Sequence, residues 1–128
     1  MSQPLSSDSP ITDRDRAARM MVFVLHGLFL VSVPLPFMTP VIGAILAFLT
    51  LVIGVALAYT SRLEAPPVWR THFDEAIRTF WTFLLLQLVG VPLVGVLLIG
   101  VIPMTAGYVL LVFRATRGLL RAAKWLGV

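Results

Sequence analysis

The amino-acid sequence predicts an all-α integral membrane protein in which four transmembrane helices form two antiparallel hairpins, with N- and C-termini both cytoplasmic. Of its 128 residues, 59% are hydrophobic and only 12% are charged, whereas soluble domains carry about 25% charged residues. Two long stretches lack charged side chains, and each is too long to cross a bilayer once. With four crossings, all the charged residues fall on one side of the membrane.

The chain begins with a polar segment of mixed charge, rich in serine, proline and aspartate. We interpret residues 1–15 as a disordered cytoplasmic tail and residues 16–121 as a four-helix membrane domain. The apolar run that starts at Met20 has no small-x-small cleavage site and leads into more apolar sequence. It therefore predicts a retained membrane helix rather than a secretory signal.

The first long stretch lies between Arg19 and Arg62 and contains His26 but no acidic or basic residue. As one helix it would be about 63 Å long, twice the roughly 30 Å of a hydrocarbon core. Three prolines in the run VPLPFMTP, residues 33–40, cannot lie inside an uninterrupted helix. We therefore expect helices at about 17–33 and 40–60.

The second stretch, between Arg78 and Arg114, contains no acidic, basic or histidine side chain and would form a helix about 52 Å long. Glycines and prolines recur between residues 90 and 103, and the chain must turn within about 92–103. We expect helices at about 72–95 and 98–121. Residues 122–128 then form a basic interfacial C-terminal end.

The placement of charge supports four crossings independently. All ten basic residues would lie on one side, namely Arg14, Arg16, Arg19, Arg62, Arg70, Arg78, Arg114, Arg117, Arg121 and Lys124. Lysine and arginine are biased toward cytoplasmic loops. That bias predicts that both termini and the middle loop face the cytoplasm.

Small residues form a stripe along the predicted helix at 40–60, and their spacing places them on one face: Gly43, Ala47, Thr50, Gly54 and Ala58. Small side chains let helix backbones approach closely in lipid. The stripe packs either against another helix of this chain or against a second copy or a partner protein.

Two polar side chains, His26 and Gln87, lie inside the predicted spans at similar depths. They form a candidate intramembrane polar pair. An ionisable group within a membrane marks a functional site by default, and the simpler reading is a neutral histidine bonded to a neighbouring helix.

The start of the third predicted helix carries a T-x-x-D capping pattern at Thr71 and Asp74. Arg78 follows Asp74 by four residues and Glu75 by three, which predicts an ion pair within the helix. Trp69 and Trp81 are expected at the level of the lipid headgroups.

His72 has no second ligand four residues away and no cluster nearby. We therefore interpret His72 as a histidine at the start of a helix that binds no metal. At the C-terminal end, basic residues spaced three and four apart predict contacts with lipid headgroups: Arg114, Arg117, Arg121 and Lys124. The expected partners are an anionic bilayer and, beyond it, other membrane proteins or a second copy; nucleic acid is not expected.

The run from His72 to Trp81 (HFDEAIRTFW) contains a candidate cytoplasmic motif made of His72, Arg78, Thr79, Phe80 and Trp81. It resembles the H-[FY]-x-x-x-I-R-T-F-W signature of small bacterial membrane proteins of domain-of-unknown-function family 4870, described as Tic-twenty-like. Arg62, Glu64-Ala65-Pro66, Trp69 and the run Arg114-x-x-Arg117-Gly118-Leu119 are similar to its pattern, so the resemblance covers about residues 17–120. It implies a four-helix topology in the bacterial inner membrane and no established activity. Asp74-Glu75-Ala76 departs from the aromatic residue and glutamine that relatives often have there.

The sequence predicts no catalytic residues, no metal site and no cofactor. It has no cysteine, no paired carboxylates in a plausible site and no hydrolase motif, so we do not expect an enzyme. A haem-binding function is disfavoured, because His26 and His72 are expected at different depths. A structural or assembly role in the membrane is favoured. The alternative is a transporter or channel subunit for a small solute or ion that uses His26 and Gln87.

Overall fold

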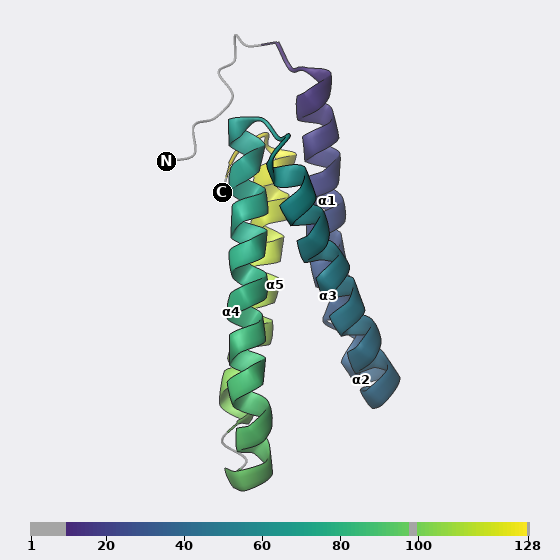
Figure 1. Cartoon of the computed structure of the whole chain (residues 1–128), viewed down its shortest axis with the longest axis vertical. Helices are drawn as coiled ribbons and strands as arrows, with labels where there is room; N and C mark the ends of the chain where they lie inside the picture. Colours follow the sequence, from purple (N-terminus) through teal and green to yellow (C-terminus); the bar gives the residue numbers. More distant parts are fainter. Residues whose placement is uncertain (1–9, 98–99, 128) are drawn as a thin grey trace.

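The computed structural model describes residues 10–97 and 100–127, and the regular secondary structure of that part of the chain is all helix, with no strand. Two hairpins lie side by side near the chain ends and diverge toward the opposite end (Figure 1). In order, the helices are α1 (Asp13–Ser32), α2 (Leu35–Met38), α3 (Pro40–Arg62), α4 (Pro67–Leu97) and α5 (Val101–Ala123). The all-helical fold is as predicted. The expected tail at residues 1–9 lies outside the described residues.

Three helical stretches are apolar and long enough to cross a membrane: Asp13–Met38, Pro40–Arg62 and Pro67–Val94. This supports the prediction of a membrane protein. The fourth long helix, α5, is not among them, because Arg114, Arg117 and Arg121 lie along its second half. Its apolar part is confined to the segment before Arg114.

Helix α1 begins at Asp13, so residues 13–15 belong to the helix and not to the predicted tail. The reason is a capping box. The amide of Asp15 donates to the Thr12 hydroxyl at 3.2 Å, and the Asp15 carboxylate accepts from the Thr12 amide at 3.0 Å. These bonds satisfy amides that have no partner inside the helix and fix its start.

The prolines at residues 34–40 end α1 and begin α3, close to the predicted boundaries of 33 and 40. Between them, the single turn α2 folds back on α3. Gly43 makes this possible, because a Cβ at that position would overlap the Leu35 carbonyl. A backbone carbonyl cannot move aside as a flexible side chain can, so the turn requires glycine here.

Helix α4 begins at Pro67, five residues earlier than predicted, because a proline suits the first position of a helix. The expected capping box at Thr71 and Asp74 is therefore wrong. Thr71 lies inside the helix and its hydroxyl donates to the Val68 carbonyl at 2.7 Å. The helix also continues through Pro92 to Leu97. Residues 98–99, where the prediction placed the start of the next helix, lie outside the described residues.

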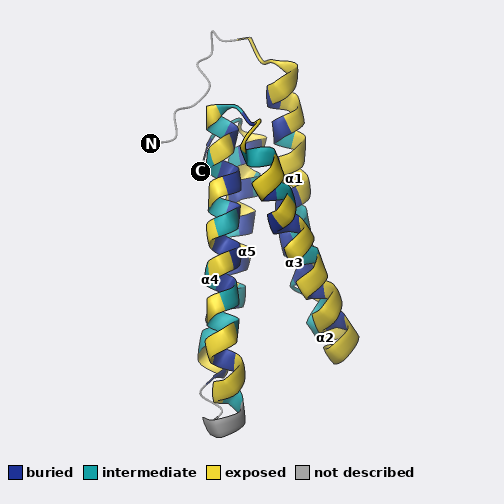
Figure 2. Ribbon diagram, viewed as in Figure 1, coloured by how far each residue is buried: buried dark blue, intermediate teal, exposed yellow. Residues whose placement is uncertain are grey.

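The buried residues lie where helices face one another, and exposed apolar side chains cover the outer surfaces (Figure 2). The predicted stripe on α3 faces inward: Gly43, Ala47, Gly54 and Ala58 are buried and Thr50 is half-buried. A Cβ on Gly54 would come within 2.8 Å of the Phe29 ring of α1. The stripe thus packs against α1 and α2 inside this chain.

Candidate functional site

Buried polar side chains gather at the end of the bundle that carries the charged residues. We call this group the polar cluster; its buried members are Asp15 and His26 of α1 and Trp69, His72 and Thr79 of α4, and its partly buried members are Glu75 of α4 and Arg114 of α5. His72, Glu75 and Thr79 are three and seven residues apart, which places them on one face of α4. The cluster therefore lies where α1, α4 and α5 meet.

Trp69 is the central apolar member of the cluster and is completely buried. Its indole nitrogen donates to the Asp15 carboxylate at 3.1 Å. Its ring stacks on His72, with centroids 5.7 Å apart and an angle of 28° between the planes. Trp69 therefore faces the interior of the bundle: a buried indole needs an acceptor, and Asp15 of α1 provides one.

His72 is also completely buried. Its Nε2 lies 2.7 Å from the Leu126 carbonyl. Since a carbonyl only accepts, Nε2 carries the hydrogen, and Nδ1 of the neutral ring is left as an acceptor. Among the described residues, Nδ1 has no hydrogen-bond partner.

His26 lies against His72, with ring centroids 6.0 Å apart in a T-shaped arrangement. The expectation that these histidines lie at different depths is wrong, because α4 begins a full turn before the predicted helix start. His26 Nδ1 donates to the Val22 carbonyl at 2.9 Å. The ring then fills the space that Gly118 of α5 leaves open.

Glu75 and Arg114 form an ion pair of 3.3 Å between α4 and α5, with side chains only 26% and 24% exposed. Arg114 Nη1 and the Thr79 hydroxyl are buried and lack hydrogen-bond partners within the described residues. The cluster therefore offers one acceptor at His72 and two donors. This donor and acceptor set suits bound water, which bridges buried polar groups that otherwise have no partner.

The structure does not bring His26 and Gln87 together. Gln87 donates to the Met104 carbonyl of α5 at 3.3 Å and packs beside Gly107, whereas His26 bonds within α1. His26 lies beside His72, fifteen residues before Gln87 on α4, so equal distances from Arg19 and Arg78 do not correspond to equal depths. No group of three or more histidine, aspartate or glutamate residues positioned for a metal ion occurs in residues 10–97 and 100–127.

The candidate cytoplasmic motif divides into two faces of α4. His72, Thr79 and Phe80 are buried, whereas Arg78 is exposed and Trp81 is 49% exposed. The predicted ion pair of Arg78 with its own helix is wrong. Asp74 pairs with Arg62 of α3 at 3.0 Å, and Glu75 pairs with Arg114. Both acids point across to other helices and stabilise contacts between them.

The four basic residues that were predicted to contact lipid headgroups differ from one another in their surroundings. Arg114 is held in the ion pair with Glu75, and Arg121 donates to the Gly127 carbonyl. Arg117 and Lys124 are exposed. Only part of the predicted basic stripe therefore faces the surroundings of the protein.

The end of α5 folds back over the bundle and closes the polar cluster. The Leu126 amide donates to the Arg121 carbonyl at 2.9 Å and the Trp125 amide to the Ala122 carbonyl at 3.1 Å, which is a Schellman motif. Trp125 has φ 58°, where glycine is usual. Its ring packs on Trp69, with centroids 5.6 Å apart, and 4.2 Å from the Arg19 guanidinium. These contacts offset the cost of the left-handed conformation.

Sequence reasoning missed Asp15, Arg19 and Gly118 as members or neighbours of this site. Arg19 donates from two nitrogens to the Ala122 and Ala123 carbonyls, both at 3.2 Å. The T-x-x-D pattern at residues 12–15 was a usable signal for the start of α1. Nothing local in the sequence indicates the contacts of Arg19 and Gly118, which join segments about a hundred residues apart.

The fold and site thus define an all-helical protein with apolar helices of membrane-spanning length and a buried polar cluster at its charged end. No protein-family model, curated protein or solved structure matches the chain.

Proposed function

We propose that this chain is a multi-pass protein of the bacterial inner membrane that crosses it four times, with both chain ends cytoplasmic. Three helices of spanning length support this proposal. So does α5, which runs back alongside α4 to the charged end (Figure 1). Its arginines then lie at the same membrane face as the ion pair between Arg62 and Asp74, in keeping with the bias of basic residues toward the cytoplasm.

A topology assay tests the number of crossings. A phosphatase reporter that is active only outside the cytoplasm is fused at residue 37, 66, 97 or 124. Four crossings predict activity at 37 and 97 and none at 66 and 124. Activity at 124 would mean that α5 does not return to the cytoplasm and would overturn the topology.

The proposed role is structural: the chain binds another membrane protein through the outward face of α3 and α4. The observation that carries this role is a fixed aromatic pair. The exposed Trp81 indole donates to the Tyr59 hydroxyl of α3 at 3.0 Å. Exposed Arg78 and the half-exposed ion pair between Arg62 and Asp74 belong to the same two helices. Tryptophan, tyrosine and arginine are the residues most enriched at binding hot spots, and a pair already held in place loses little freedom on binding.

The transporter alternative loses its main support, because His26 and Gln87 bond to different carbonyls. The resemblance of the HFDEAIRTFW run to the Tic-twenty-like family agrees with a membrane component of no known reaction.

Photo-crosslinking in native membranes tests the assembly role. A benzophenone amino acid is placed at Leu85, one turn beyond Trp81 and 60% exposed, which leaves the aromatic pair intact. We expect a crosslink to one reproducible membrane protein, reduced at least about tenfold by Trp81→Ala, since a hot-spot side chain contributes about 2 kcal/mol or more.

The matched control carries the same probe at Val31 of α1, which is 56% exposed on another face. It should give no such product. Crosslinks to lipid alone at both positions, or a product at Leu85 that Trp81→Ala leaves unchanged, would contradict the assembly role without affecting the topology.

A further inference from the structure

The face of α3 and α4 that carries the aromatic pair presents two hydrogen-bond donors to its surroundings. The Tyr59 hydroxyl accepts from the Trp81 indole at 3.0 Å. A phenol both accepts and donates, so the hydrogen of Tyr59 remains available to a binding partner. Arg78 precedes Trp81 by three residues and lies beside it on the exposed side of α4. A guanidinium and a hydroxyl, both donors, therefore flank the same indole.

The carboxylates closest to Arg78 in the sequence are already bonded to other helices. Asp74 pairs with Arg62 of α3 at 3.0 Å, and Glu75 pairs with Arg114 of α5 at 3.3 Å. Within residues 10–97 and 100–127, Arg78 itself has no ion pair. Its positive charge is therefore available to a carboxylate from outside the chain, and complementary charge is what selects one partner over another.

Beyond the aromatic pair, the same side of α4 is apolar. Exposed residues follow Trp81 at intervals of four, three and four, namely Leu85, Leu88 and Pro92. From Trp81 to Pro92 the helix rises about 16 Å, which is half of a hydrocarbon core of about 30 Å. A fluid acyl chain gains nothing from aromatic rings held in one orientation, whereas a rigid partner does. The face therefore suits a second helix that runs along α4.

A second copy of this chain does not supply the missing carboxylate. Two copies in the same membrane orientation would meet through the same face, which would bring Arg78 toward Arg78, and like charges in an interface are unfavourable. The described carboxylates that are not already paired across helices belong to α1 or, for Glu64, line a hollow with Arg14 and Arg70 on the side of α1. The charge on this face therefore favours a different protein.

We infer that the partner at this face is a transmembrane helix of a different protein, with an aspartate or glutamate at its cytoplasmic end that accepts from Arg78 and the Tyr59 hydroxyl. A carboxylate has two oxygens and takes two parallel hydrogen bonds from a guanidinium. The apolar side of the partner helix then covers Leu85 and Leu88. The inference rests on the proposed assembly role and adds the chemistry of the partner.

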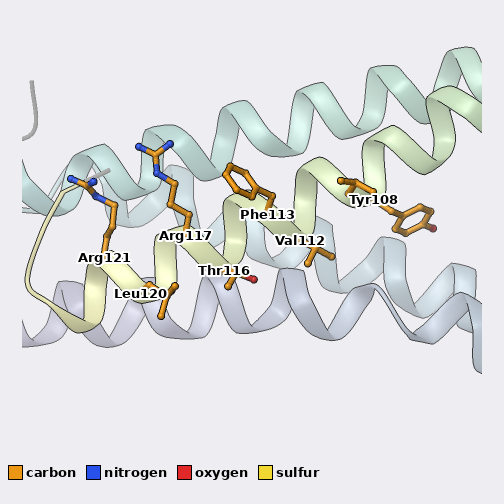
Figure 3. Close-up of a pocket in the computed structure, with 8 residues that line it drawn as sticks. Tyr108, Val112, Phe113, Thr116, Arg117, Leu120 and Arg121 are labelled. Carbon is orange, nitrogen blue, oxygen red and sulfur yellow. The ribbon is translucent and has the colours of Figure 1, made fainter.

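The benzophenone probe at Leu85 in native membranes also tests this chemistry. Leu85 lies seven residues, about 10 Å, from Arg78. Mass spectrometry of the crosslinked peptide should therefore find an aspartate or glutamate about seven residues to the cytoplasmic side of the linked position. Arg78→Gln should lower the yield about tenfold, because a hydrogen bond to a charged group contributes about 1.5–3 kcal/mol. Arg117→Gln is the matched control: it removes the same charge from exposed Arg117 of α5 (Figure 3) and should leave the yield unchanged.

A charge swap separates binding from any general loss of folding. Arg78→Glu should abolish the product, and replacing the carboxylate of the partner with arginine in the same cells should restore it. Three results would overturn the inference: a product made only with a second copy of this chain, an undiminished yield in Arg78→Gln, or no restoration by the swap. The absence of any protein product at Leu85 is a different result, which refutes the assembly role itself and the inference with it.

Discussion

Replacing Trp69 with alanine is expected to lower the free energy of unfolding by about 3–5 kcal/mol, the usual cost of removing a large buried aromatic side chain. Trp69 is fully buried and contacts the rings of His72 and Trp125. The variant leaves a cavity beneath the end of α5 and removes a donor from the buried Asp15 carboxylate. Unfolding of the purified protein by increasing fractions of sodium dodecyl sulfate, followed by circular dichroism, measures the change.

Two variants make this test specific. Trp69→Phe keeps most of the packing and loses the hydrogen bond to Asp15, so a smaller loss of about 1–3 kcal/mol is expected. Trp81→Ala truncates the same residue type at a half-exposed position and should cost less than Trp69→Ala. If Trp81→Ala proved as destabilising as Trp69→Ala, the burial of Trp69 at the polar cluster would be refuted.

Substituting Gly118 with alanine is the second large effect that we expect, a loss of about 1–3 kcal/mol from overpacking. The added Cβ would overlap His26 Nε2 and Cδ2 and lie 3.0 Å from Cε1. The histidine ring cannot easily move, because its Nδ1 is bonded to the Val22 carbonyl and its other side lies against His72. The same detergent titration measures this loss.

The matched control is a glycine-to-alanine substitution that we expect to raise the free energy of unfolding rather than lower it. A Cβ at Gly27, also within a helix, meets nothing within 4 Å. Gly27→Ala should therefore stabilise the protein by about 0.5–1 kcal/mol, the helical preference of alanine over glycine. In a His26→Ala background the cost of Gly118→Ala should largely disappear, because coupled neighbours give non-additive changes. An undiminished cost there would show that His26 is not the obstacle.

The helical fold and the turn between the first two long helices were predictable because local chemistry determines them. Prolines fix the turn at residues 34–40, and the sequence placed the start of α3 at Pro40, where it lies. The first residues of α1 and α4 were harder to predict, because the T-x-x-D pattern occurs at both residues 12–15 and 71–74. Only the first caps a helix, since Pro67 has already begun α4 before Thr71.

The polar cluster could not be predicted, because it depends on how helices face one another. Arg114 and Arg117 look alike in the sequence, yet one pairs with Glu75 across α4 and the other is exposed. His72 has no second ligand in its own helix, and its neighbour His26 comes from α1. The prediction that His26 and Gln87 lie at similar depths counted residues from Arg19 and from Arg78. It failed because Arg19 and Arg78 do not lie at the same level.

The closure of the cluster by residues 122–127 sets an order of events during synthesis. Arg19 emerges from the ribosome early, but its acceptors are the carbonyls of Ala122 and Ala123. His72 likewise waits for the Leu126 carbonyl. The hydrogen bonds that close the charged end therefore cannot form until the last residues of α5 and the segment after it have been made.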